Sequence, residues 1–300
     1  MRFSFWPAST QSWEDVLEMA LHVESTGWDG FYFCDHFMPN SRNVDVPWAE
    51  VFTTLGGIAA SVPRIRFGTL VCGNTYRHPA VLAKMAATLD RISGGRFVLG
   101  LGAGWQENEH VAYGIPFYTL GERLARLEEA CQVVKALFTE KRASFKGRYY
   151  QLEDAALEPK PVQQPLPLLV GGGGEKVTLR IAARWADEWN VWGDVATLQH
   201  KMGVLDRHCA RVGRDPRAIR RSAVALLQLV DDPQAAEKIR SSAAGRPLIA
   251  GTLDEVAKVV QAYRDAGVDE LIIPDFNLGP RAQKLATLDR FIREIAPSAR

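Results

Sequence analysis

The chain has 300 residues, 47% of them hydrophobic, which is enough to bury one large core. Thirty-six lysines and arginines oppose 35 acidic residues, and the resulting net charge of +1 gives no reason to expect nucleic acid or a membrane surface as a partner. The chain start lacks the apolar segment of a signal peptide, and no apolar run approaches the roughly 18 residues needed to cross a bilayer.

Short apolar runs alternate with amphipathic helical segments along the chain. The strands predicted from these runs are residues 2–6, 30–34, 65–72, 96–101, 166–170, 188–192, 222–230 and 270–274. The clearest helix, residues 121–138, has one apolar stripe, and other helices are expected over 13–25, over 52–60 and from Pro79. Eight strands alternating with helices, with no GxGxxG in the first unit, predict a closed (β/α)8 TIM barrel in a single domain, 1–300.

One segment breaks this alternation. Residues 143–152 are aromatic and alternating, with Gly147 as a possible turn, and a proline-rich stretch follows. We expect a small surface hairpin and an extended connection, inserted between the fourth helix and the fifth strand.

Active sites of such barrels lie at the carboxyl ends of the strands. Asp35 and His36 directly follow the second strand, and an imidazole titrates near neutral pH, so His36 is the best candidate for proton transfer. Asp35 would orient it or hold the following turn. The alternative is an ordinary loop histidine. His78 precedes Pro79 at the start of a helix, which favours a structural role there.

A second candidate follows the fifth strand. Four glycines, residues 171–174, leave backbone amides uncovered, and a helix follows, so the segment is a plausible phosphate cradle to which Lys176 adds charge. A flexible strand-to-helix turn is the alternative. The glycines of residues 100–104 lie within a strand of the fourth unit, so we reject a dinucleotide site and expect them to let a flat ring approach. Trp105 and Trp192 would line that pocket; the alternative is that both only pack against neighbouring residues at the strand ends.

The four cysteines, Cys34, Cys72, Cys131 and Cys209, are widely spaced and form no metal-binding pattern with histidine. We therefore expect no metal and four reduced thiols in a cytoplasmic protein.

Several motifs occur together in an order that is highly specific. They are Cys34-Asp35-His36-Phe37, residues 66–71 (RFGTLV), residues 77–80 (RHPA), residues 90–96 (DRISGGR), residues 100–105 (GLGAGW), Glu122-Arg123, residues 171–176 (GGGGEK) and residues 266–270 (AGVDE). With them the chain resembles the luciferase-like family of flavin- and deazaflavin-dependent oxidoreductases over nearly its whole length, and it is most similar to the subgroup that uses coenzyme F420.

The resemblance implies a (β/α)8 barrel, often dimeric, whose ring-shaped cofactor sits at the carboxyl end. It implies a cis peptide bond between Leu70 and Val71, an active-site histidine at His36, and phosphate binding by residues 172–174. The expected cofactor contacts are Leu70, Val71, Cys72, Gly73, Asn74, Gly104, Trp105, Asn108, Gly171, Gly172, Gly173, Gly174, Glu175, Lys176 and Trp192, and the expected catalytic residues are His36 and Asp35.

The chain also departs from the family pattern. Sugar-phosphate dehydrogenases of this family carry an acidic residue where Trp105 stands, which argues against sugar-phosphate oxidation. The leading hypothesis is hydride transfer between coenzyme F420 and an organic small-molecule substrate in a homodimer. The alternatives are an FMN-dependent monooxygenase that uses separately reduced flavin, and a flavin-binding protein without catalysis.

Overall fold

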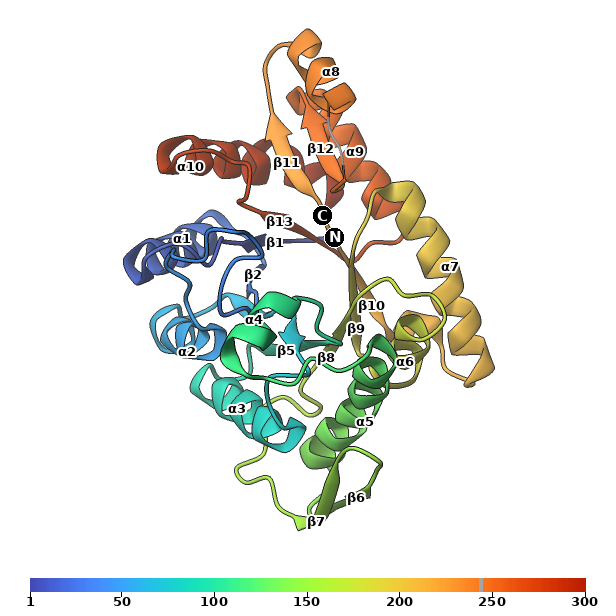
Figure 1. Ribbon diagram of the computed structural model, residues 1–300. Coiled ribbons are helices and arrows are strands. Elements are labelled where there is room, and N and C mark those ends of the chain that lie inside the picture. Colours follow the sequence, from blue (N-terminus) through green and yellow to red (C-terminus); the bar gives the residue numbers. More distant parts are fainter. Residues whose placement is uncertain (243–244) are drawn as a thin grey trace.

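The computed structural model describes residues 1–242 and 245–300, and a closed ring of eight parallel strands lies at its centre (Figure 1). The ring strands are β1 (Arg2–Trp6), β2 (Gly30–Phe33), β3 (Arg66–Thr69), β5 (Phe97–Gly102), β8 (Leu168–Gly171), β9 (Glu188–Trp192), β10 (Arg220–Val224) and β13 (Glu270–Pro274). Their order is β3-β2-β1-β13-β10-β9-β8-β5, and β5 pairs back to β3. The predicted (β/α)8 barrel is confirmed.

Helices surround this ring. They are α1 (Trp13–Thr26), α2 (Val51–Ser61), α3 (Pro79–Ile92), α4 (Glu107–Tyr113), α5 (Leu120–Thr139), α6 (Thr178–Trp185), α7 (Val195–Arg211), α8 (Pro233–Ser242), α9 (Leu253–Asp265) and α10 (Arg281–Arg290). Local signals set their ends. The side chain of Ser12 caps the start of α1, and Gly27 ends that helix at a φ of 93°. His78 caps α3 by accepting from the backbone N–H of Ala80, which confirms its structural role.

The core has two layers because successive side chains of each strand point to opposite faces. Phe31, Phe67 and Trp189 face outward and pack under the helices. Tyr32 and Leu169 belong to the smaller cluster inside the ring. The middle of the barrel is therefore filled with side chains, and only its ends offer room for a ligand.

Charged side chains close the amino end of the barrel. Arg2, Arg66, Glu188, Arg220 and Glu270 are each the first residue of a ring strand. Arg66 contacts both buried carboxylates, while Arg220 lies 2.8 Å from Glu188 and Arg2 lies 2.8 Å from Glu270. Burial alone raises the pKa of Glu188, but the nearby guanidinium groups outweigh burial and leave it below its ordinary value.

Two predicted strands are interrupted in the structure. The third, predicted over 65–72, divides into β3 and β4 (Cys72–Gly73), with the cis Leu70–Val71 peptide bond between them. The seventh, predicted over 222–230, is β10 only as far as Val224. The chain then leaves the ring, and β11 (Leu226–Leu229) pairs with β12 (Leu248–Gly251) instead. The pattern of apolar residues continues through the break, so the sequence did not reveal it.

Two segments project from the barrel (Figure 1). The first is the predicted hairpin, which consists of β6 (Ala143–Lys146) and β7 (Gln151–Ala155) between α5 and β8, and its prediction is confirmed. The second consists of β11, α8 and β12, and we call it the β11–β12 lobe. It is drawn in orange at the top of Figure 1 and was not predicted.

Candidate active site

The positions predicted for the active site come together at the carboxyl end of the barrel. Asp35 follows β2, Val71 follows β3, Gly104 follows β5, Gly171 closes β8 and Trp192 closes β9. Because the ring strands are parallel, these five positions lie around one rim. The predicted placement of the strand ends is thereby confirmed.

His36 lies in the loop after β2 and is held by a carboxylate that the sequence analysis did not single out. Nδ1 of His36 lies 2.7 Å from Oε1 of Glu109, which belongs to α4. The same carboxylate accepts hydrogen bonds from the backbone N–H of Phe37 at 2.6 Å and from the hydroxyl of Tyr76. Glu109 is fully buried, and its two oxygens face these three donors.

These hydrogen bonds determine which nitrogen of His36 carries the proton. Burial alone raises the pKa of Glu109, but hydrogen bonds from His36, Tyr76 and Phe37 outweigh burial and leave that pKa below its ordinary value. An ionised carboxylate only accepts hydrogen bonds, so Nδ1 of His36 is the donor. Nε2 is then the nitrogen with a lone pair, and the side chain keeps an exposed fraction of 17%.

Asp35 makes different contacts. Its Oδ2 accepts from Nη1 of Arg77 at 2.7 Å and from the backbone N–H of Gly73 at 3.2 Å, and Nη2 of Arg77 donates to Glu50 at 2.8 Å. Burial raises the pKa of Asp35 in spite of the adjacent guanidinium group. Of the two roles considered for Asp35, these contacts are those of a residue that ties the loops after β2 and β3 together.

A glycine-lined wall surrounds Val71. The Leu70–Val71 peptide bond is cis, as the family resemblance implied. A Cβ atom on Gly102 or on Gly171 would lie 2.8 Å from a methyl carbon of Val71, and one on Gly100 would lie 3.0 Å from such a carbon. Only glycine leaves room for Val71 at these positions on β5 and β8. The rim here consists of backbone and one branched side chain, which suits the approach of a flat ring.

The next three predicted contacts differ from one another. Cys72 is buried in the outer core layer, so its thiol faces the helices. The backbone N–H of Gly73 is engaged by Asp35. The side chain of Asn74 is buried and donates to the hydroxyl of Tyr150 at 3.3 Å, whereas its Oδ1 has no hydrogen-bond partner among the described residues. Of the three residues, Asn74 is the one whose side chain, through its amide, is suited to bind a polar ligand atom.

The glycine loop, residues 171–176, leads from β8 towards α6. Gly172 has a φ of 126°, a conformation that side-chain-bearing residues rarely adopt, and its N–H donates to the carbonyl of Asn190. In the described part of the chain, the N–H groups of Gly173 and Gly174 donate to no protein acceptor. Two free amides ahead of a helix fit the predicted phosphate cradle.

A cation that the sequence analysis missed supports this loop. Lys201, on α7, donates to the carbonyl of Gly173 at 2.8 Å and lies 3.2 Å from the carboxylate of Glu175. Nε2 of His200 also lies 3.1 Å from the Glu175 carboxylate, so this predicted contact residue positions the side chains of Lys201 and His200 beside the loop. Lys176 is exposed, as the prediction of an added charge requires.

The segment after β5 places an aromatic ring beside His36. The indole of Trp105 meets the imidazole edge to face at 5.4 Å, and 60% of this residue is exposed. Gly104 has a φ of 78°, which lets the chain turn there. Nδ2 of Asn108, which is predicted to contact the cofactor, donates to the carbonyl of Pro39 at 3.1 Å and so holds the loop after β2, while its Oδ1 has no hydrogen-bond partner among the described residues.

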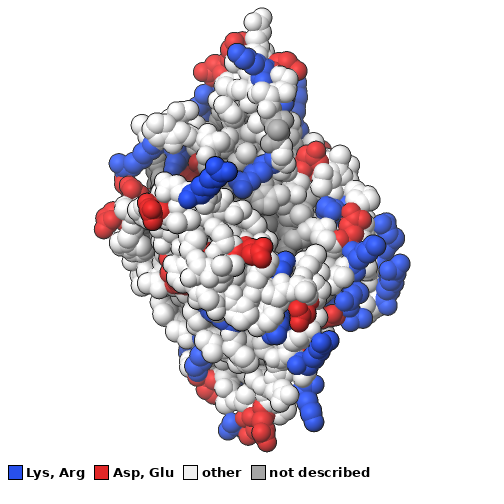
Figure 2. Space-filling view, viewed as in Figure 1, with Lys and Arg blue, Asp and Glu red and all other residues white. Residues whose placement is uncertain are grey.

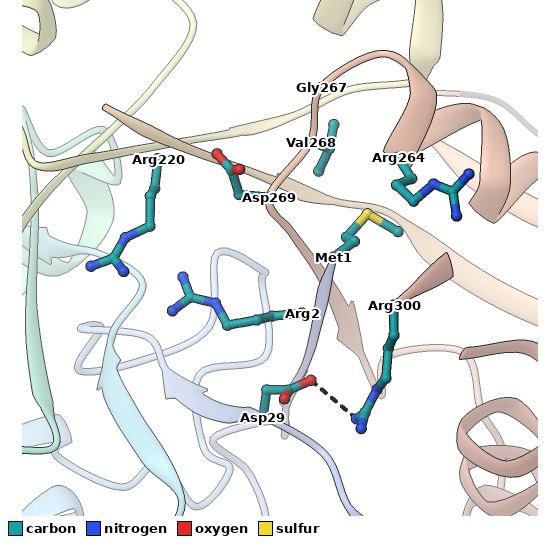
Figure 3. A pocket seen from close by; sticks show the side chains of 9 residues that line it. All are labelled: Met1, Arg2, Asp29, Arg220, Arg264, Gly267, Val268, Asp269 and Arg300. Carbon is teal, nitrogen blue, oxygen red and sulfur yellow. Dashed lines mark hydrogen bonds and ion pairs between the residues drawn. The ribbon is translucent and has the colours of Figure 1, made fainter. Parts of the chain in front are cut away.

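A hollow of about 640 Å³ lies at the opposite, amino end of the barrel (Figure 3). Figure 3 shows Arg2 and Arg220 directed into the same space, while Arg300 pairs with Asp29 at 3.2 Å. Arg2 and Arg220 already pair with the buried carboxylates of the barrel floor. This hollow is remote from His36, so we place the chemistry at the other end.

Three structural findings bear on the remaining expectations. No group of three or more histidine, cysteine or acidic side chains suited to a metal ion occurs in residues 1–242 and 245–300. None of the helices that the structure describes combines the length and the apolar character needed to span a bilayer. All four cysteines are buried and unpaired, as predicted.

Comparisons with known proteins place these observations in context. A family model described as luciferase-like monooxygenase matches residues 1–250. An F420-dependent glucose-6-phosphate dehydrogenase of Kineococcus radiotolerans is 31% identical, over 95% of this chain and 93% of its own. The structure of an F420-dependent secondary alcohol dehydrogenase in complex with an F420-acetone adduct has a TM-score of 0.85 at 21% identity, and the match covers 100% of this chain and 99% of that one. The oxygenating constituent of the 3,6-diketocamphane monooxygenase of Pseudomonas putida, in complex with FMN, has a TM-score of 0.74 at 16% identity, with coverage of 99% and 98%.

Proposed function

Because the chain belongs to the luciferase-like monooxygenase family, as its motifs suggested, we propose that it is an oxidoreductase that transfers a hydride between coenzyme F420 and an organic substrate. The observation that carries this proposal is the hydrogen-bonded pair of His36 and Glu109 at the same rim as the glycine-lined wall. The pair supplies a proton carrier, and the wall supplies a place for a flat ring.

The residues at the rim suit a deazaflavin. Gly100, Gly102 and Gly171 leave the surface around Val71 free of side chains, and a ring would lie against it. The free amides of Gly173 and residue 174, with Lys201 behind them, would hold the phosphate. When bound, a deazaflavin accepts or donates a hydride and reacts poorly with oxygen.

His36 would handle the proton that accompanies the hydride. With Nδ1–H directed at the ionised Glu109, Nε2 can accept the proton of a substrate hydroxyl or, once protonated, return it to a carbonyl oxygen. Glu109 also stabilises the imidazolium that forms in between. Tyr76 and the N–H of Phe37 keep the carboxylate in place.

The substrate of the sugar-phosphate dehydrogenase relative is not part of this proposal. Trp105 stands where sugar-phosphate dehydrogenases of the family carry an acidic residue. We also propose a single domain, a homodimer and a cytoplasmic location, which stay predictions.

The experiment that tests the function compares two cofactors. Purified protein is titrated with coenzyme F420 and with FMN, and binding is followed by fluorescence. Alcohols and ketones are then screened for a change in deazaflavin absorbance. We expect tighter binding of the deazaflavin and turnover that needs no oxygen. Preferential binding of FMN, with oxygen-dependent turnover, would instead support the monooxygenase alternative.

A further inference from the structure

Aromatic side chains gather on one side of the barrel mouth. Trp6 closes β1, Trp192 closes β9, and Phe276 follows the end of β13 by two residues. The ring centroids of Trp6 lie 5.9 Å from Trp192 and 5.1 Å from Phe276, and Trp192 stacks on Phe276 at 6.4 Å. Strands β1, β13, β10 and β9 are consecutive in the ring, so this aromatic cluster lines one half of the mouth.

The other half of the mouth has the opposite character. Strands β3, β5 and β8 carry Val71, the glycines around it and the glycine loop. A surface of backbone therefore lies across the mouth from a surface of rings. The two halves are suited to different ligands, and the glycine half is the one already assigned to the cofactor.

The aromatic half is open to a ligand. Phe276, which belongs to this half, is 41% exposed. Trp105 follows β5 on the other half, lies beside His36 and is 60% exposed, so a ligand can contact rings from both sides of the mouth. Large aromatic side chains exposed around a concave site are typical of surfaces that bind apolar ligands. Figure 2 shows the molecule hollowed between the β11–β12 lobe and α7.

A positive charge lies at the edge of this surface. The guanidinium group of Arg246 lies 5.1 Å from the ring centroid of Trp192 and 5.5 Å from that of Phe276. It occupies the position in which a cationic ligand would interact most favourably with these rings. Arg246 thus disfavours a cation and tolerates a neutral or anionic molecule.

We propose that the substrate is a neutral or anionic molecule with a ring-containing apolar body, which packs against Trp105, Trp192 and Phe276. Its hydroxyl or carbonyl group faces His36, and this last point rests on the proposed function. Trp105 and Phe276 are specificity-determining residues, because they contact the body of the substrate and leave proton transfer to His36.

Binding of simple probes tests the proposal without turnover. Naphthoate and naphthylmethylammonium are titrated by calorimetry into protein saturated with the cofactor that it binds more tightly. We expect naphthoate to bind and the ammonium probe to bind more weakly. Trp105→Ala and Phe276→Ala should each weaken naphthoate binding about tenfold, as loss of an aromatic contact and its buried area implies. Ile92→Ala, an exposed position at the far end of α3, should change nothing.

Absence of naphthoate binding, or equal affinity in all three variants, would overturn the proposal. Turnover separates it from the proposed function. With coenzyme F420, cyclohexylmethanol should be oxidised with a higher kcat/KM than ethanol, and Trp105→Ala should reduce this preference through KM. Probe binding without any hydride transfer would contradict only the proposed function. Hydride transfer that favours ethanol, with an unchanged KM in Trp105→Ala, would contradict only the proposal that the substrate has a ring-containing apolar body.

Discussion

The carboxylate of Glu109 lies 2.7 Å from Nδ1 of His36, although 73 residues separate the two in the chain. The contact joins the loop after β2 to α4, which follows β5. It sets the tautomer of the imidazole, and Glu109 gains two further donors that fix its position.

Replacing Glu109 with glutamine tests its role as a positioning residue. The side-chain NH2 group of glutamine would face His36, Tyr76 or the N–H of Phe37, and all three donate to Glu109 in the wild type. The imidazole would then lose its orientation or change its tautomer. We expect turnover to fall on the order of 10²- to 10⁴-fold, as for loss of the orienting carboxylate in a triad, with cofactor affinity unchanged. Glu107→Gln, an exposed position on the same helix, is the matched control. Turnover of Glu109→Gln close to that of the wild type would remove Glu109 from the mechanism.

His36→Ala removes the proton carrier itself. General acid–base groups typically contribute ~10²–10⁴-fold in rate, and turnover should fall by that factor. Cofactor affinity should change little, because the glycine loop belongs to another strand. The measurements are absorbance-based turnover and a cofactor titration. Turnover close to that of the wild type would exclude the histidine, whereas loss of cofactor binding would assign it to the ring pocket instead.

Gly173→Val should weaken cofactor binding. A Cβ atom at this position would lie 3.0 Å from a methyl carbon of Val191 and 3.1 Å from Cε of Lys201, and the larger valine side chain would crowd both neighbours and the space beside the loop amides. We expect at least about a tenfold loss of affinity, equivalent to about 1.4 kcal/mol, with the melting temperature nearly unchanged. Gly121→Ala is the control, since no neighbouring atom lies within 4 Å of its Cβ. Unchanged affinity in a folded Gly173 variant would contradict the phosphate site.

The barrel floor makes a prediction about acid stability. The folded pKa of Glu188 lies below its ordinary value, so its ion pairs stabilise the fold at pH values above about 4.3, and this contribution is lost as the pH falls through the lowered pKa. Glu188→Gln should lower the free energy of unfolding by about 3–5 kcal/mol at neutral pH. The free energy of unfolding of this variant should also depend less on pH in the acid range. Urea unfolding at several pH values measures both effects. Glu237→Gln removes an exposed ion pair with Arg240 on α8, and its free energy of unfolding should match that of the wild type. A Glu188 variant with the full acid dependence of the wild type would refute this account.

The sequence predicted the frame of the site better than its contacts. Strand ends follow from apolar runs, so the rim positions of Asp35, Val71 and Gly171 were predictable. Glu109 was not, because its pairing with His36 depends on how α4 folds over a loop from another unit. The predicted contacts after the fourth strand ended at Asn108, one residue before Glu109. A carboxylate on a short helix after a barrel strand is the signal that would have found it.

Other omissions have similar physical causes. Lys201 belongs to a helix after β9 and reaches the glycine loop only in the folded chain. The sequence does not show that β11 leaves the ring, because Leu227 is buried in the lobe just as it would be in the barrel. Local patterns report which residues are buried and do not report against which element.

The way the β11–β12 lobe joins the barrel has an evolutionary consequence. β10 pairs directly with β13 through Ser222, Ala223 and Val224, and β11 and β12 pair only with each other. Ala225 still bonds the ring through its N–H to the carbonyl of Ile272 at 3.3 Å, but no described residue of β11, α8 or β12 hydrogen-bonds a ring strand. Insertions or replacements between Leu226 and α9 would therefore leave the barrel closed. Exchange of this one module can then replace Arg246 beside Trp192 and Phe276 while His36, Glu109 and the glycine loop are inherited intact.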